Sequence, residues 1–449
     1  MSNIHDQAMY YIYQQVLERL MEHMTQAQRA SVQLLIQRLL VSAGGVEYLH
    51  DFRLLVVLGH DRSTLSLLAF LRAAQLSIAL RAPDTFRLQV VVGSRTALTD
   101  DLLDTFEQAC TTLFLQDDPR VELLAASGSR VQSFSRQALC GVEPLDADRD
   151  MLLMFGHLAA GQPEAVLGSR LHLEAADTLR ALLICGAAPS ALVTAIPARQ
   201  RQRYVAWSRA TMRLSGERGD PAVHRCAGAL CEMLGRVHGL LASALHDPGN
   251  AVSGPRAELA LRVIAVDDLL NHPQADDRLI SALGLRRSPS ASAALAATCI
   301  DPAYLNHLQG LYVHWSQPGS DTAWMSNESS SGLFKRAYGI DEVQLTCLLF
   351  APFAERGEGL ANFIERCHPA MRGALPHLHQ ALQGEPCPQS VVQWMLDTSG
   401  LSLAQLRALY EGRIDPIVSR LVRRLARRDT HLRLIGPSRP HPSAATAGS

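Results

Sequence analysis

Lysine is almost absent from this chain of 449 residues: Lys335 is the only one, and the other 41 of the 42 basic residues are arginine. A bacterial genome rich in G and C explains this bias, because arginine codons are rich in those bases. Avoidance of lysine modification inside a foreign cytosol is a second explanation. The first predicts an ordinary bacterial protein, and the second predicts one that is delivered into a eukaryotic cell.

The chain also lacks a long hydrophobic run and a charge of one sign. No uninterrupted apolar run approaches the roughly 20 residues of a membrane helix, and the first residues, MSNIHDQAMYYIYQQ, lack the basic and apolar regions of a signal peptide. With 47% hydrophobic residues, 19% charged residues and a net charge of −1, the composition is that of a globular protein. We expect a cytoplasmic protein without a transmembrane segment, and export by a signal-independent route is the alternative.

Paired cysteines are missing as well. The nine cysteines are scattered, none has CxxC spacing, and most lie within apolar segments. An odd number in this distribution predicts reduced, mostly buried thiols instead of a disulfide framework.

The hydrophobic pattern predicts an α/β region followed by an all-α region. Two helices are expected within residues 4–43, because apolar residues recur there at helical spacing. Beyond them, continuous apolar runs alternate with helical stretches, which is typical of strands buried on both faces of a parallel sheet. We therefore predict a Rossmann-like, doubly wound parallel sheet of about five strands within roughly 52–200, formed by runs at 54–59, 88–93, 121–126, 151–156 and 181–186.

Residues after about 202 are expected to be helical, including the stretch around 256–272. The polar segment at 316–332 is either a surface loop or a boundary. The predicted division is a helical hairpin (1–45), the Rossmann-like domain (46–200), a helical region (201–316), a C-terminal helical domain (333–434) and a disordered tail (435–449).

The carboxyl ends of parallel strands are the default ligand site of a doubly wound sheet. Two Gly-plus-hydroxyl turns follow the first two predicted strands, and they supply Gly59, His60, Asp61, Arg62 and Ser63, then Gly93, Ser94 and Arg95. Backbone N–H groups at a helix N-terminus, with arginine beside them, favour a phosphate group. Ordinary helix capping explains the same residues, so both interpretations stay open.

Two further strand ends place His157 and Cys185 at this rim. A thiol nucleophile needs a base within about 3 Å. The pair locally resembles the cysteine peptidases of the caspase and separase group, in which one strand ends in Gly-His and a later one in Cys. That resemblance implies a dyad with Cys185 as nucleophile and His157 as base, whereas packing of two strand ends is the structural alternative.

Histidine and cysteine do not converge on a metal site. His224, Cys231 and His238 are spaced by seven residues, which separates neighbours by about 10.5 Å along a helix, too far for one ion. A second group, Cys367, His368, His377, His379 and Cys387, matches no zinc spacing. We predict no metal and no cofactor.

The last predicted helix is the strongest charge feature. The segment RIDPIVSRLVRRLARRDTHLR carries seven arginines against two aspartates, beside an apolar stripe at helical spacing. Five of these arginines are predicted to bind a partner: Arg420, Arg423, Arg424, Arg427 and Arg428. The helix could dock on the core with its arginines in water, or bind an acidic partner, a membrane surface or a phosphate backbone.

The segment before it, VVQWMLDTSGLSLAQLRALYEG, reads as helix, short turn, helix, an arrangement that DNA-binding proteins also use. We therefore expect a non-enzymatic binding, regulatory or adaptor protein with a protein partner, associated with secretion or a host. A cysteine peptidase and a nucleic-acid-binding regulator are the alternatives. The sequence does not decide the oligomeric state.

Overall fold

The computed structural model describes most of the 449 residues, and all structural statements concern these. The described ranges are 2–59, 62–82, 84–92, 100–127, 130–136, 146–159, 162–184, 188–216, 227–246, 259–270, 273–285, 302–316 and 328–432. Within them, none of the helices combines the length and the apolar character needed to span a membrane.

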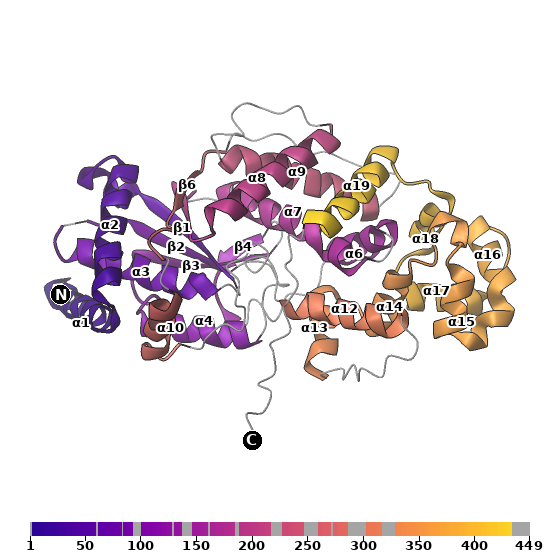
Figure 1. Ribbon diagram of the computed structural model, residues 1–449, viewed down its shortest axis with the longest axis horizontal. Coiled ribbons are helices and arrows are strands. Elements are labelled where there is room, and N and C mark those ends of the chain that lie inside the picture. The colour runs from indigo at the N-terminus through magenta and orange to yellow at the C-terminus, as the bar shows by residue number, and fades with distance from the viewer. Residues whose placement is uncertain are drawn as a thin grey trace, which may run out of the picture.

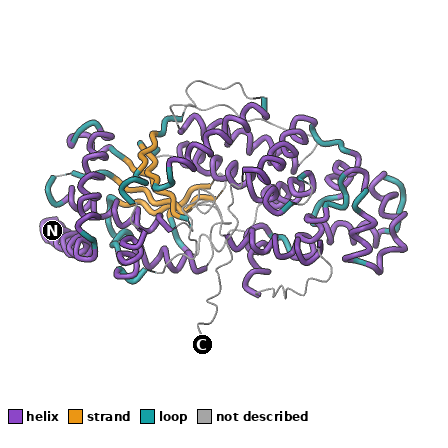
Figure 2. Tube along the Cα trace, viewed as in Figure 1, coloured by secondary structure: helices purple, strands orange, loops and turns teal. Residues whose placement is uncertain are grey.

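One six-stranded sheet lies near the N-terminal end of the molecule, with helices on both sides (Figures 1 and 2). The strand order is β4-β3-β2-β1-β5-β6, and every neighbouring pair is parallel except β3 and β4. The strands are β1 (Arg53–Leu58), β2 (Arg87–Val92), β3 (Val121–Ser127), β4 (Arg130–Ser133), β5 (Ala191–Thr194) and β6 (Arg262–Ala265). The predicted α/β class with a mostly parallel sheet is confirmed.

The described helices before residue 283 include some that pack on this sheet and some, such as the helix over residues 146–158, that pack on other helices. They are α1 (Ser2–His23), α2 (Gln26–Ala43), the short 3-10 helix η1 (Val46–Asp51), α3 (Arg62–Ala79), α4 (Asp100–Thr112), α6 (Asp146–Leu158), α7 (Pro163–Ile184), α8 (Ala198–Leu214), α9 (Ala227–His246) and α10 (Pro273–Ala282). The first two form the helical pair predicted before the sheet, and Thr25 begins α2 with a capping box that includes Gln28.

From residue 302 onward, the described part of the chain contains helices and no strand. It contains α12 (Pro302–Ser316), α13 (Glu328–Tyr338), α14 (Glu342–Phe350), η4 (Glu355–Gly357), α15 (Leu360–Cys367), η5 (Pro369–Ala374), α16 (Leu375–Gln383), α17 (Gln389–Ser399), α18 (Leu403–Glu411) and α19 (Pro416–Leu432). Figure 1 shows α15–α18 at the end of the molecule far from α1, while α19 returns to the helices that adjoin the sheet.

Both faces of the central strands are buried, which explains their continuous apolar runs. Along β1, Leu54 and Val56 point into the cluster formed with α1–α3, whereas Leu55 packs on the opposite face with Leu179 and Leu182 of α7. A strand buried in this way has no polar face and therefore shows no period-two alternation.

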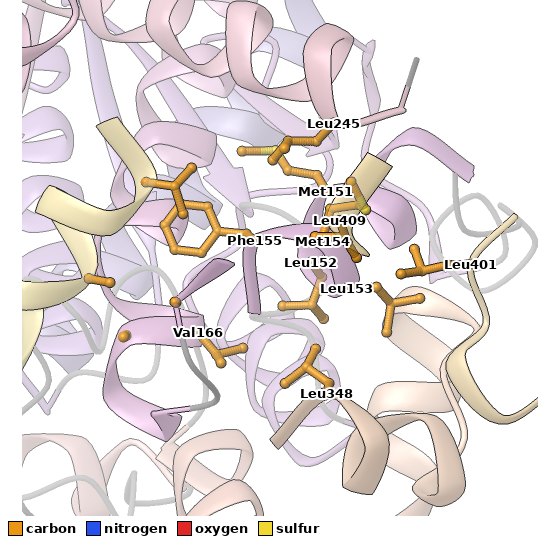
Figure 3. Close-up of a cluster of buried hydrophobic side chains, with 14 of the residues drawn as sticks. Met151, Leu152, Leu153, Met154, Phe155, Val166, Leu245, Leu348, Leu401 and Leu409 are labelled. Atoms are coloured by element: carbon orange, nitrogen blue, oxygen red, sulfur yellow. The ribbon is translucent and has the colours of Figure 1, made fainter. Parts of the chain in front are cut away.

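Two of the five predicted strands are wrong. Residues 151–156 belong to α6 and residues 181–184 end α7. The first segment, MLLMFG, consists mainly of Met and Leu, which are strong helix formers, whereas LLVVL and LQVVV of β1 and β2 contain β-branched Val. All residues of α6 from Asp150 to His157 are buried, so the helix has no polar face that would reveal its period (Figure 3).

Three strands were not predicted. β4 continues from β3 as an antiparallel edge strand, β5 begins five residues after the end of the predicted run at 181–186, and β6 lies within a stretch predicted to be helical. β5 and β6 have only four residues each, which is too short for a clear apolar run to stand out.

Candidate functional site

The histidine of the predicted dyad lies in the helical core. His157 is in the last turn of α6 and is 1% exposed, and its ring stacks on Phe353 with 6.2 Å between centroids. Its Nδ1 lies 2.8 Å from the carbonyl oxygen of Leu153. Because a carbonyl only accepts, Nδ1 carries the proton. The prediction that His157 follows a strand is wrong, since α6 is a helix.

Burial also determines the charge of this imidazole. The loss of solvation on burial lowers the pKa of His157 to about 4, although the hydrogen bond to Leu153 opposes the shift. Its Nε2 is buried and has no hydrogen-bond partner among the described residues. A neutral ring enclosed in this way favours a packing role. Cys185 lies outside the described residues, directly after the last residue of α7 in the sequence, so the dyad itself stays a prediction.

The predicted rim is only partly described. β1 and β2 are parallel and in register, so their last residues, Leu58 and Val92, lie at one edge of the sheet. Gly59 is buried after β1, Arg62 begins α3, and Ser63 is half-buried in its first turn. The remaining rim residues, His60, Asp61, Gly93, Ser94 and Arg95, lie outside the described residues. The strand order reverses between β1 and β5, which is where ligands bind in doubly wound sheets.

Ion pairs occupy the part of this edge that follows β5 and β6. Asp267 accepts a hydrogen bond from the backbone N of Ala198, at the start of α8, at 3.1 Å and pairs with Arg201 at 2.7 Å. Its neighbour Asp268 pairs with Arg38 of α2 at 2.8 Å. The N-terminus of α8 therefore already has a carboxylate at the position an anion would take. The sequence did not reveal this cap because β6 was predicted to be helical.

The described residues contain no group of three or more His, Cys, Asp or Glu side chains that could hold a metal ion. His224 lies outside them. His238 is buried in α9, with Nδ1 3.2 Å from Oδ2 of Asp177 in α7, and Cys231 is buried in the same helix. These two residues belong to the packing of α7 against α9.

A second Asp–His pair lies where α6, α9 and α18 meet. Oδ2 of Asp150 in α6 lies 2.7 Å from Nδ1 of His246 in α9, and Nε2 of Gln405 in α18 donates to the same oxygen at 2.9 Å. The His246 side chain is 49% exposed. No described hydroxyl or thiol is hydrogen-bonded to this imidazole, so the three residues connect three helices and do not form a catalytic triad.

The helix α19 is amphipathic in the way its sequence predicts. Its apolar side lies in the largest core cluster of the protein, together with residues of α6, α7 and α9. The buried residues of this side are Val418, Leu421, Val422, Leu425 and Ala426, and Ile414 precedes them. Asp415 accepts hydrogen bonds from the backbone N–H groups of Ile417 and Val418, and so caps the helix N-terminus.

The opposite side of α19 exposes arginine. Arg420, Arg423, Arg424 and Arg427 are exposed, and the side chain of Arg428 lies outside the description. Arg423 approaches Glu355 at 3.7 Å, with both side chains more than half exposed. Within the described part of the chain, no carboxylate oxygen lies within 4.0 Å of Arg420 or Arg424. This side is therefore an exposed positive surface.

Buried polar contacts hold the helices beneath α19. The guanidinium of Arg170 in α7 donates to the Tyr338 hydroxyl at 2.7 Å and pairs with Glu174 at 3.2 Å. Trp207 of α8 donates to the hydroxyl of Ser169 at 2.7 Å. Charges and dipoles buried in this way are costly unless they are paired, so these contacts fix the relative positions of α7, α8 and α13.

The predicted helix–turn–helix exists, but its second helix is packed inside. α17 and α18 are joined through Gly400, whose φ of +69° lies in the left-handed region. Five of the nine residues of α18 are buried, and only Ala404 and Glu411 are exposed. A recognition helix needs an exposed polar face to enter the major groove. α18 does not have one.

The chain matches no family model, no curated protein and no solved structure. No likeness to a protein of known activity therefore favours one chemistry over another.

Proposed function

We propose that this chain is a non-enzymatic binding protein, a regulator or adaptor, and that α19 binds an acidic or phosphate-bearing surface of a protein partner. The observation that carries the proposal is the orientation of α19: its apolar side is buried in the core and its arginines face solvent. Exposed positive charges gathered on one helix face repel one another, so this arrangement does not by itself stabilise the fold. Such a face instead accelerates association with an acidic partner.

The same orientation disfavours a membrane-surface helix. An interfacial helix inserts its apolar side among lipid tails, whereas the apolar side of α19 is already packed against α6, α7 and α9. Insertion would require α19 to leave the core and expose Leu421 and Leu425, both fully buried. While α19 stays packed in the core, it can bind a membrane only through electrostatic attraction between its arginines and anionic headgroups.

We also propose the cytoplasm as the location, with signal-independent export to a host as the alternative. None of the described cysteines forms a disulfide, and Cys110, Cys231 and Cys347 are buried. Burial raises the pKa of the Cys110 thiol to about 12. Buried thiols without disulfides suit a reducing compartment.

The test is a pull-down of the full-length tagged protein from its own cells. The variant Arg420→Glu/Arg424→Glu reverses two exposed charges without touching the buried side of α19, whereas deletion of residues 413–449 would also remove core residues. The matched control Arg87→Glu/Arg278→Glu reverses two exposed arginines of β2 and α10.

We expect the partner to be lost from the α19 variant and kept by the control, with unchanged circular dichroism for both. A partner that binds both variants equally would refute a role of α19.

A further inference from the structure

The helix α8 carries a second row of exposed arginines. This helix of 17 residues contains five arginines and no acidic residue. Trp207, Thr211 and Met212 are buried on one side, and the outward side exposes Arg199, Arg203, Arg209 and Arg213. Their spacing of four, six and four residues keeps them on one face of the helix.

α8 and α19 are neighbours although about 200 residues separate them in the sequence. The two helices are in direct contact, and Figure 1 shows both on the same side of the molecule, together with α9. Trp207 and Met212 of α8 belong to the same core cluster as Val418 and Leu421 of α19. Because both inner sides pack on one core, the two outer sides border one surface.

Four arginines of this surface have no carboxylate partner among the described residues. In the described ranges, no carboxylate oxygen lies within 4.0 Å of Arg203 or Arg213 of α8, and the same holds for Arg420 and Arg424 of α19. Like charges gathered on adjacent helices repel one another, so a ligand of opposite charge relieves the repulsion when it binds.

We infer that α8 and α19 together form one binding surface, the two-helix basic surface (the outward sides of Ala198–Leu214 and Pro416–Leu432), for an acidic segment of a partner protein. This inference rests on the proposed function, because α19 is half of the surface. It adds that binding needs α8, and that the ligand is an acidic polypeptide and not a nucleic acid.

Two observations favour a polypeptide. Ile417 is 53% exposed and precedes Arg420 and Arg424 by three and seven residues, so a large apolar side chain shares the face with the arginines. The aromatic rings of α8 are turned inward, with Tyr204 half-buried and packed on the buried Trp207 at 5.2 Å. Single-stranded nucleic acid is bound by stacking of its bases on exposed aromatic rings, whereas an acidic segment with an apolar residue matches arginines beside Ile417.

The spacing also suits a helical ligand. Arginines four residues apart on α8 lie about 6 Å apart along its axis, and those on α19 recur every three to four residues. Carboxylates at i and i+4 of an acidic helix recur at the same interval.

The experiment measures fluorescence anisotropy of a labelled probe with the full-length protein. The probe is a peptide of about sixteen residues, rich in glutamate with a leucine at every fourth position. A peptide with glutamine in place of glutamate and a single-stranded oligonucleotide of similar charge serve as comparisons. The proteins are the wild type, Arg203→Glu/Arg213→Glu in α8, Arg420→Glu/Arg424→Glu in α19, and the control Arg87→Glu/Arg278→Glu.

We expect the glutamate peptide to bind the wild type and the control equally, and to bind each helix variant about tenfold more weakly. The glutamine peptide should not bind. If only the α19 variant loses affinity, α8 is not part of the surface and this inference is overturned while the proposed function stands.

If neither variant loses affinity, or if the wild type does not bind the peptide, the inference is overturned, and the pull-down described above then decides the proposed function separately. Tighter binding of the oligonucleotide than of the peptide at equal salt would overturn the assignment to an acidic polypeptide.

Discussion

Acid should destabilise this protein through buried imidazoles, of which His157 is one. His157 has a pKa of about 4 in the folded chain, against 6.5 for a solvated histidine, because burial disfavours its charged form. The unfolded chain therefore binds more protons than the folded chain between these two values. The contribution of His157 to stability therefore falls as the pH drops through 6.5 and changes no further once the pH is below about 4.

The magnitude follows from the two pKa values. Between pH 7 and pH 5, protonation of the unfolded state removes about 2 kcal/mol of the free energy of unfolding. The variant His157→Leu keeps an apolar side chain of similar volume against Phe353 but cannot titrate. Its free energy of unfolding should fall by about 2 kcal/mol less than that of the wild type over this range.

Urea unfolding followed by circular dichroism at pH 7, 6 and 5 measures the difference. His172 offers an independent repeat, because burial also lowers its pKa to about 4, and His172→Leu should flatten the profile by a similar amount. If His157→Leu retains the full pH dependence of the wild type, the imidazole accepts protons in the folded state. In that case solvent reaches His157, and a role as a catalytic base would again be open to it.

Two substitutions probe the packing of the core by thermal unfolding. Gly156→Ala should cost about 1–3 kcal/mol, because its Cβ would lie 2.5 Å from Cγ of Leu348, whereas Gly239→Ala, which meets no heavy atom within 4 Å, should stabilise α9 by about 0.5–1 kcal/mol. Equal effects of the two would contradict the close approach of α6 and α14. Asp118→Asn should cost about 3–5 kcal/mol, because the pair with Arg72 spans 2.7 Å and both side chains are fully buried, and a loss below about 1 kcal/mol would show that the pair contributes little.

Composition could have separated β1 and β2 from the false strand at 151–156. β1 and β2 contain Val at alternate or successive positions, while the run at 151–156 consists of Met, Leu and Phe before its glycine. Length and apolar character alone do not distinguish a strand from a helix buried on every side. The glycine that ends the run looked like a strand end, but in α6 it provides space for Leu348.

The buried side of α19 could be predicted from the sequence, but the helices that pack around α19 could not. The spacing of Val418, Leu421, Val422 and Leu425 is a local signal, and burial confirms it. The arginines of α8 were equally visible in the sequence, since this segment of 17 residues contains five of them and no acidic residue. Their place beside α19 depends on how distant segments pack, which no local pattern contains.

The helix α7 has a consequence for how the chain unfolds. Its first part, including Val166 and Leu171, lies in the large helical cluster, and its last part, with Leu179 and Leu182, covers one face of the sheet. Twenty-two residues form one uninterrupted helix between them. Melting either cluster alone requires a break within α7 or leaves half of its apolar side in water. The sheet and the helical core therefore unfold as one cooperative unit, and a substitution that destabilises one of them also destabilises the other.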